Sequence, residues 1–407
     1  MRLLFLTSRL PFPPNRGDRT RVFNFIRTLS ADHEIDLISF ISRESECVHR
    51  RQVLSFCRAV HLVRIPPIQS ALSAVFNAWR DLPLQVSYYR SQAMRRTIDA
   101  VVGASSFDAV YVHLFRMAPY AEHLRDAYRI VDLTDVISQE IKRSLPYRSL
   151  PSRILYAIEQ PRIERYERLV AGACDEVWMV AERERRALAA ACPEANVRVV
   201  PCGVDAGLFH PTEADDGMCR LLFVGNMCVP HNVDAAVYLV QDILPRVRAQ
   251  LPDVRLTIAG ADPVRVVRML EKNPAVTVTG YVPDLNGLLN QTSVFVAPLR
   301  FGAGVQNKVI EAMAAGRPVV TTRLVNDGLR ATPGRDLLVA DDPGDLAGHI
   351  VTLCRDPLRR RQLGAQARRF VTRHYRWSCV SDRMRAIQEA NTNPDAFRKD
   401  SSAPGAG

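Results

Sequence analysis

The sequence predicts an α/β protein made of two doubly wound domains, each built on a parallel sheet. Its 407 residues exceed what one ordinary core supports, so two domains of roughly 200 residues are expected. Short apolar runs alternate with helix-like segments through both halves of the chain. A stretch rich in glycine, proline and acidic residues interrupts this alternation near the middle. Such alternation is typical of βαβ units, in which helices cover both faces of the sheet.

The first domain is expected to span residues 1–205. Its strand candidates are the apolar runs at 2–8, 34–41, 59–66, 107–114, 128–134, 175–182 and 197–205. An amphipathic pattern at 19–30 predicts a helix after the first strand, and helical patterns lie between most of the others. Residues 206–218 carry no periodicity and are expected to form the linker.

The second domain is expected to span residues 219–375. Its strand candidates lie at 219–226, 254–260, 276–282, 294–299, 317–322 and 336–340, with helices at 232–250, at 263–272 and around Lys308. A last helical stretch covers 356–390, and its part at 376–392 is expected to cross back to the first domain. The polar tail 393–407 is expected to be disordered.

The composition indicates which cellular compartment and which kinds of partner to expect. Nine scattered cysteines form no CxxC pair, and the apolar start is broken by Thr7, Ser8 and Arg9 too early for a signal peptide. We therefore expect reduced thiols and a cytoplasmic protein. No run approaches the roughly 20 apolar residues that span a bilayer. The net charge of +11 suits phosphate-rich partners such as nucleotides or an anionic membrane surface.

The stretch "FGAGVQNKVIEAMAAGRPVV", residues 301–320, combines glycines with a charged helix start. On a helical wheel, Gly304, Asn307, Lys308 and Glu311 share one face. Unpaired N–H groups, a positive helix end and a lysine together favour a diphosphate, and Glu311 could accept hydrogen bonds from a sugar diol. A surface Lys–Glu pair after an ordinary glycine turn would have the same spacing.

This stretch resembles the donor-binding signature of the family 4 glycosyltransferases, enzymes of the GT-B fold with two Rossmann-like domains facing a central cleft. The phrases "VVPCGVDAGLFHP", "LLFVGNM" and "FDAVYVHLFRMAPYA" extend the resemblance from residue 1 to about 390. It is nearer the branch of sugar transferases from exopolysaccharide loci. The resemblance implies that Glu311 binds the ribose, whereas Ala303 replaces the first glutamate of the paired-glutamate motif. Asn226 stands where an arginine is common, which leaves Lys308 as the cation for the phosphates.

Site residues in the first domain are expected where strands end. Arg16, Gly17, Asp18 and Arg19 lie between the first strand and its helix, where Gly17 could bring N–H groups to the ligand. Asp18 as a simple N-cap is the alternative. His113 matches the second histidine of the family's "HxH"-like strand end, which implies a contact with the donor sugar. A purely structural histidine is the other interpretation.

The expected site has three parts. The residues expected to be catalytic are His113, Lys308 and Glu311, and the donor-binding set is Gly17, Gly225, Asn226, Gly302, Ala303, Gly304, Val305, Asn307, Lys308 and Glu311. On the acceptor side we expect Arg16, Asp18, Arg19, Asp132 and Asp135. No metal cluster is apparent, and acidic residues at 341–345 are better explained by a turn and an N-cap.

The function implied is a retaining glycosyltransferase that moves a sugar from a nucleoside-diphosphate donor to a glycan acceptor, lipid-linked in the form we favour, in exopolysaccharide or surface-glycan synthesis. The nucleotide sugar is its substrate, and no cofactor is expected. Basic and aromatic segments at 70–98 and 142–156 suit an anionic membrane surface, or are core aromatics with solvated arginines. A sugar-nucleotide epimerase of the same fold and a non-catalytic basic binding protein remain alternatives. No RRM, KH or zinc pattern supports nucleic-acid binding, and no GxGxxG follows the first strand.

Overall fold

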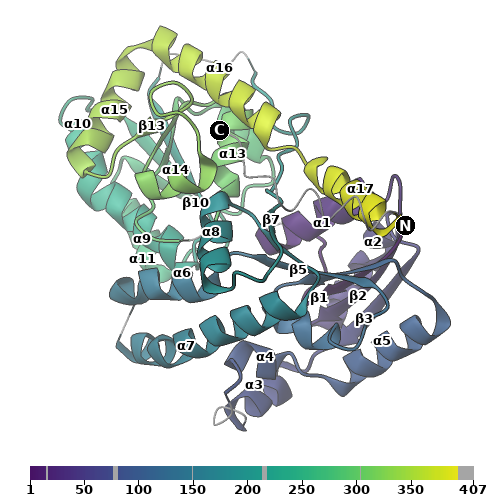
Figure 1. Cartoon of the computed structure of the whole chain (residues 1–407). Coiled ribbons are helices and arrows are strands. Elements are labelled where there is room, and N and C mark those ends of the chain that lie inside the picture. The colour runs from purple at the N-terminus through teal and green to yellow at the C-terminus, as the bar shows by residue number, and fades with distance from the viewer. Residues whose placement is uncertain (15–16, 77–80, 149, 213–217, 303, 393–407) are drawn as a thin grey trace.

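The chain folds into two α/β domains, each with a parallel sheet between helices (Figure 1). The computed structural model describes residues 1–14, 17–76, 81–148, 150–212, 218–302 and 304–392. The first sheet has seven strands in the order β3-β2-β1-β4-β5-β6-β7, and the second has six in the order β10-β9-β8-β11-β12-β13. The predicted class, two doubly wound parallel-sheet domains, is confirmed.

The first domain contains every element up to β7. Its strands are β1 (Arg2–Thr7), β2 (Glu34–Ile41), β3 (Ala59–Arg64), β4 (Ala109–His113), β5 (Tyr128–Thr134), β6 (Glu176–Met179) and β7 (Val197–Val199). Its α-helices are α1 (Gly17–Leu29), α2 (Arg50–Leu54), α3 (Pro67–Phe76), α4 (Leu84–Tyr88), α5 (Gln92–Ala104), α6 (Ile137–Ser144), α7 (Leu150–Ala173) and α8 (Glu182–Ala191). Three 3₁₀ segments, η1 (Glu44–His49), η2 (Phe115–Tyr120) and η3 (Leu145–Tyr147), complete it.

The second domain starts at β8. Its strands are β8 (Arg220–Val224), β9 (Arg255–Ala259), β10 (Val276–Gly280), β11 (Val294–Ala297), β12 (Val319–Thr321) and β13 (Leu338–Val339). Its α-helices are α9 (Pro230–Tyr238), α10 (Leu244–Arg248), α11 (Arg265–Arg268), α12 (Leu285–Asn290), α13 (Asn307–Ala314), α14 (Arg323–Leu329), α15 (Pro343–Arg355) and α16 (Pro357–His374). The helix predicted at 232–250 is α9 and α10 joined by a π-helical turn, η4 (Leu239–Ile243), and that predicted at 263–272 is α11 followed by a 3₁₀ turn, η5 (Met269–Lys272).

Burial on both faces explains why these strands read as continuous apolar runs. In β1, residues 3–6 are all at most 1% exposed, because helices cover each side of the sheet. Helix α1 buries Val22, Phe25, Ile26 and Leu29, a spacing that places all of them on one face. These two elements are neighbours in sequence, and their packing fixes where α1 begins relative to the sheet.

The last helix, α17 (Cys379–Thr392), returns to the first domain and lies beside α1 (Figure 1). Trp377, Val380 and Met384 join the first-domain core, where the Trp377 ring lies 6.0 Å from that of Phe25. The sequence suggested one helical stretch at 356–390, but the structure divides it into α16 and α17 at residues 375–378. The break lets the chain leave one core and enter the other. The predicted tail 393–407 lies outside the described residues.

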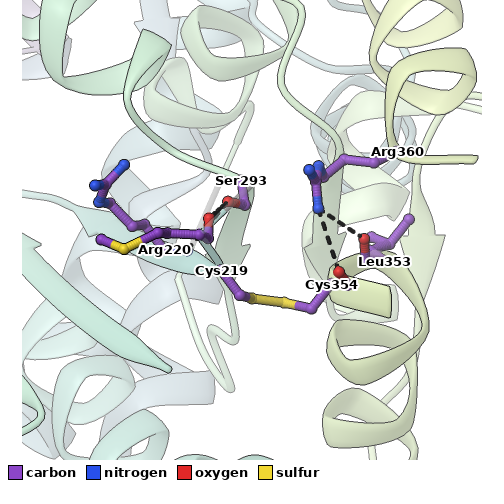
Figure 2. Close-up of a disulfide and its surroundings, with 7 residues drawn as sticks. Cys219, Arg220, Ser293, Leu353, Cys354 and Arg360 are labelled. Atoms are coloured by element: carbon purple, nitrogen blue, oxygen red, sulfur yellow. Dashed lines mark hydrogen bonds between the residues drawn. A yellow bond between two sulfur atoms is a disulfide. The ribbon is translucent and has the colours of Figure 1, made fainter. Parts of the chain in front are cut away.

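One pair of cysteines differs from the expectation of free thiols. Cys219, just before β8, forms a disulfide with Cys354 in α15, although 135 residues separate them (Figure 2). Nearby, the Arg220 N–H donates to Ser293 Oγ at 3.1 Å. Arg360 donates to the carbonyl of Cys354 at 3.4 Å (Figure 2). The prediction of free thiols is therefore wrong for this pair. The two cysteines are far apart in the sequence and meet only in the folded protein, so no local spacing pattern indicates the disulfide. The other seven cysteines are free.

Candidate active site

The strand orders place one ligand crevice in each domain. β1 lies between β2 and β4, and β8 lies between β9 and β11, so the order reverses at β1/β4 and at β8/β11. Open parallel sheets bind ligands beyond the carboxyl ends of the strands at such points. The segments there are the loop from β1 to α1, the end of β4 at His113, the loop after β8 and the loop from β11 to α13.

Helix α1, which follows the loop after β1, and helix α13, which follows the loop after β11, face each other across the two domains. Gly17 is the first residue of α1, and Asn307 is the first residue of α13. A Cβ atom added to Gly17 would lie 3.7 Å from Asn307 Nδ2, so the two N-termini approach closely. Each exposes unpaired N–H groups and the positive end of its dipole. The structure thus brings together residues that are 290 positions apart and that the sequence assigned to one site.

The glycine loop before α13 fits tightly against the first domain. Gly304 adopts a φ of 62°, and a Cβ there would lie 2.1 Å from Asp135 Oδ1, so no larger residue fits without a shift. Gly302 has a φ of 136° and offers its carbonyl to Arg143 Nη1 at 3.3 Å. Val305 packs against the cores of both domains. Ala303, the remaining predicted residue of this loop, lies outside the described residues.

Lys308 and Glu311 lie on α13 and are both partly buried. Lys308 Nζ donates a hydrogen bond to Asn232 Oδ1 and lies 5.3 Å from the centre of the Phe223 ring. Burial lowers the pKa of Lys308 to about 7, although Glu311 opposes the shift. Burial likewise raises the pKa of Glu311 to about 7, against the effect of Lys308. A ligand that brings negative charge would restore the ammonium form, since an opposite charge favours it.

The loop after β8 supports this lysine through Asn232. Asn232 Nδ2 donates to the carbonyl of Asn226 at 3.0 Å, and a Cβ on Gly225 would lie only 2.7 Å from the Asn232 side chain. Gly225 and Asn226 were predicted to bind the donor. In the structure they contact Asn232, whose side chain accepts the hydrogen bond from Lys308. Asn232 lies in the first turn of α9, and it was not among the residues expected at the site.

His113 ends β4 at the first-domain crevice and is 3% exposed. Burial lowers its pKa to about 4, although Asp132 and Asp18 act in the opposite direction, so the imidazole is neutral near pH 7. Its Nε2 atom has no hydrogen-bond partner among the described residues. A neutral imidazole with one free nitrogen can accept a hydrogen bond from, or donate one to, a sugar hydroxyl, depending on its tautomer.

Unsatisfied polar atoms collect at this crevice. In the described part of the chain, Thr7 Oγ1, His113 Nε2, Asp135 Oδ1 and Asn307 Oδ1 are all buried without a hydrogen-bond partner. They come from the ends of β1 and β4, the segment after β5 and the start of α13. Because buried polar groups are nearly always paired, such a group of orphans indicates a place for a polar ligand or for water.

Asp132 is not available to an acceptor, contrary to the expectation from its strand-end position. It is fully buried, and its carboxylate accepts from Arg21 Nε at 2.6 Å and Nη2 at 3.2 Å. The Tyr111 hydroxyl donates to it at 2.5 Å, and the Thr134 N–H donates at 3.1 Å. These donors occupy both oxygens, so Asp132 anchors α1 to β4 and β5 beneath His113. Sequence reasoning missed Arg21, whose place on the apolar face of α1 was the available signal.

The other acceptor-side candidates fall into different places. Asp135 faces the glycine loop, and burial together with Glu140 and Glu184 raises its pKa well above the usual range, which favours the neutral acid. Asp18 accepts from Arg9 at 3.1 Å and lies near His113. Arg19 instead lies 3.5 Å from Glu46 in η1, and Arg16 is outside the described residues. Within the described chain, no three His, Cys, Asp or Glu side chains are grouped as a metal site requires.

An aromatic contact that the sequence did not reveal closes the edge of the crevice. The Tyr147 ring from η3 stacks on Phe301 of the second domain, with centroids 4.5 Å apart and planes 14° apart. The guanidinium of Arg300 lies 5.5 Å from the same tyrosine ring. With the Arg143 hydrogen bond to Gly302, this contact ties the segment after β5 to the donor loop. Aromatic pairs of this kind contribute about 0.5–1.5 kcal/mol beyond the area they bury.

Comparison with known proteins shows that the chain is similar to glycosyltransferases. Residues 219–356 match the family described as "Glycosyl transferases group 1". A protein of Klebsiella pneumoniae described as an uncharacterized 44.6 kDa protein in the cps region is 22% identical over 391 residues, covering 92% of this chain and 96% of its own. D-inositol 3-phosphate glycosyltransferase of Mycobacterium bovis is 26% identical over 345 residues, covering 76% and 68%.

Solved structures agree on the fold over nearly the whole chain. Sucrose-phosphate synthase of Thermosynechococcus elongatus superposes with a TM-score of 0.72 at 16% identity, covering 96% of this chain and 99% of that one. HepE of Anabaena, solved with UDP and glucose, gives 0.69 at 14% identity, covering 96% and 100%. The two domains and their facing crevices are therefore the GT-B fold. The family match covers residues 219–356, so the second domain is similar to the glycosyl transferases group 1.

The Arg21–Asp132 pair gives a stability prediction with a control on the same helix. We expect Arg21→Ala to lower the free energy of unfolding by about 3–5 kcal/mol, because it leaves the Asp132 carboxylate buried without a cation. Arg27→Ala removes an exposed partner of Asp205 and should cost less than about 1 kcal/mol. Urea unfolding followed by tryptophan fluorescence measures this, since Trp178 and Trp377 both lie in the first-domain core. Equal losses for the two variants would contradict the anchoring role.

Proposed function

We propose that the chain is a retaining family 4 glycosyltransferase that transfers a sugar from a nucleoside diphosphate to a saccharide acceptor. The observation that carries the proposal is the approach of the α1 and α13 N-termini beside the partly buried Lys308. Two sets of N–H groups and one ammonium converge there, and a diphosphate is the ligand whose charge and size match them. HepE, solved with UDP-glucose, UDP and glucose, is a structural neighbour whose ligands agree with this chemistry.

The site supports the reaction by stabilising the leaving group. The bond between the anomeric carbon and the diphosphate oxygen breaks while a bond to the acceptor hydroxyl oxygen forms. Negative charge then develops on the diphosphate, where Lys308 and the N–H groups of α13 are already oriented. The proton of the attacking hydroxyl passes to a departing phosphate oxygen, and His113 positions the reacting sugar. In this proposal Glu311, which lies one turn beyond Lys308 on α13, accepts hydrogen bonds from the ribose.

We propose that the second domain holds most of the donor, that Gly17 of the first domain contacts the donor diphosphate, and that the rest of the first domain holds the acceptor. The donor set is Gly17, Gly225, Asn226, Gly302, Ala303, Gly304, Val305, Asn307, Lys308 and Glu311, and no separate cofactor takes part. We also propose placement at the cytoplasmic face and a role in surface-glycan or exopolysaccharide synthesis. The description of the Klebsiella relative, which places it in the cps region, supports the second of these.

A lysine substitution tests the donor site directly. Lys308→Ala should lower turnover by about 10²–10³-fold, because it removes a cation from the developing charge. Lys272→Ala, which changes an exposed lysine of η5, should leave turnover unchanged. The measurement is sugar transfer or donor hydrolysis with a panel of nucleotide sugars, after thermal shifts have identified the one that binds. A ligand at 100 times its Kd stabilises the folded state by about 2.7 kcal/mol.

Two outcomes would overturn this proposal. Near-normal turnover of Lys308→Ala would remove the lysine from the mechanism. If no nucleoside diphosphate or nucleotide sugar raised the unfolding midpoint of the wild-type chain, donor binding itself would be wrong. A product that is an epimerised nucleotide sugar formed without acceptor would favour the epimerase of the same fold instead.

We further propose that the acceptor is lipid-linked and that α3 and α7 contact an anionic membrane surface. Both helices expose large apolar side chains, among them Phe76 at 79% and Leu150 at 74%. On α7, Ile154 is also exposed, next to the exposed Arg153. Apolar residues interleaved with arginines suit the headgroup region of an anionic leaflet. None of the described helices is long and apolar enough to cross a bilayer.

Vesicle binding tests this surface. The wild-type chain should sediment with vesicles that contain anionic lipid and much less with phosphatidylcholine vesicles. The triple variant Phe76→Ser, Leu150→Ser and Ile154→Ser should bind at least about tenfold more weakly, since three apolar side chains no longer insert. Leu358→Ser, an exposed leucine of α16 in the second domain, is the matched control and should bind normally. Equal binding by the triple variant would show that another surface, or none, meets the membrane.

A further inference from the structure

A group of polar and charged side chains beside His113 is not explained by donor binding. Arg116 lies in η2, directly after β4, and is only partly exposed. Its Nε donates to Ser8 Oγ at 3.1 Å, and its Nη1 donates to Gln85 Oε1 at 2.9 Å. Its guanidinium also lies 5.1 Å from the centre of the Tyr89 ring. All three contacts are with uncharged groups.

The charge of Arg116 is therefore not balanced by a direct partner. Among the described residues, no carboxylate lies within ion-pair distance of Arg116. Asp18, the acid whose charge acts on Arg116, is already paired with Arg9 at 3.1 Å. Arg9 and Asp18 neutralise each other, and His113 is uncharged near pH 7. The group of Arg9, Asp18, Arg116 and His113 thus carries one net positive charge.

A guanidinium shielded from water by neutral neighbours is costly unless an anion joins it. The Arg9 side chain is 38% exposed and that of Asp18 is 23% exposed, so the group remains open to solvent. It lies at the carboxyl ends of β1 and β4, in the domain opposite Lys308. The charges of Asp18 and Arg116 both act on His113, whose Nε2 is buried and unpaired and which positions the reacting sugar in the proposed mechanism.

We propose that Arg116, with Arg9 beside it, binds an anionic group carried by the acceptor. This inference rests on the proposed function, and it names the substrate class: an acceptor with a carboxylate or phosphate close to the hydroxyl that attacks. A guanidinium suits both anions, because its planar N–H groups match two oxygens at once. Helix α4, which supplies Gln85 and is followed directly by Tyr89, also contacts α3. A phosphate that links the acceptor to lipid would thus reach the group from the proposed membrane side.

Binding of simple sugars to the UDP-loaded wild-type chain tests the inference. The probes are methyl glucoside, glucuronate and glucose 6-phosphate, which present no charge, a carboxylate and a phosphate. Binding is measured by ligand-observed NMR titration. At least one anionic sugar should bind about tenfold more tightly than the neutral one, the gain expected from one charge-assisted hydrogen bond. Which of the two binds more tightly separates an acidic sugar from a linking phosphate.

Substitution of the arginine completes the test. Arg116→Gln should abolish the preference for anionic sugars, Arg116→Lys should keep part of it, and both should bind UDP with unchanged affinity. Arg165→Gln, which alters an exposed pair with Asp81, is the control and should behave as the wild-type chain does. If Arg116→Gln does not fold, the lysine variant alone decides, because a structural role would not preserve a charge preference.

The outcomes separate this inference from the proposed function. Equal binding of neutral and anionic sugars, absence of sugar binding in the UDP-loaded protein, or a preference that survives in Arg116→Gln would overturn the anionic acceptor and leave the donor site intact. A loss of UDP affinity in Arg116→Gln would reassign Arg116 to the donor diphosphate. Failure of the wild-type chain to bind UDP or any other nucleotide would instead count against the proposed function.

Discussion

The ammonium group of Lys308 is kept largely from water within the second domain, with a neutral amide as its hydrogen-bond partner, and the remaining features of the site follow from that constraint. A lysine in such surroundings loses part of its tendency to stay charged. Among the described residues, no carboxylate of the first domain forms an ion pair with Lys308, and the charge that acts on it is that of Glu311 on the same helix. The arrangement makes sense if a polyanion supplies the missing charge for part of each catalytic cycle.

In the first domain, by contrast, two buried charges are paired with each other within the protein. Beneath His113, Arg21 and Asp132 satisfy each other completely, and the Tyr111 hydroxyl completes the network. Because this network fixes α1 to β4 and β5, Gly17 at the start of α1 holds a constant position opposite Asn307. One buried charge pair is thus structural, and the incompletely paired groups nearby, His113 and Arg116, are those free to meet a substrate.

The sequence predicted much of the fold, and it led to the proposed donor residues, for a physical reason. Strands buried on both faces and amphipathic helices leave periodic patterns, and a glycine loop before a helix that carries Lys308 and Glu311 is a local arrangement. The π-helical turn in the helix predicted at 232–250 and the break between α16 and α17 depend on packing, and the sequence showed neither.

The sequence also did not predict the contacts between segments that are far apart along the chain. Asp132 was predicted to contact the acceptor because it ends a strand and its partner Arg21 lies 111 residues away in the sequence. The Cys219–Cys354 disulfide likewise joins residues that no local sequence pattern connects. The stacking of Tyr147 on Phe301 and the neutral partners of Arg116 are likewise products of tertiary structure. Residue type indicated which side chains could do chemistry, but only the fold showed which of them are already occupied.

The central claim is that N–H groups from both domains grip one diphosphate, and amide hydrogen exchange with and without UDP tests it most directly. The account predicts slower exchange in peptides that cover the start of α1 and in peptides that cover 304–312, and no such slowing in α1 with uridine, which lacks the diphosphate. Slower exchange in the second domain alone, or in neither helix start, would contradict a site shared between the two domains.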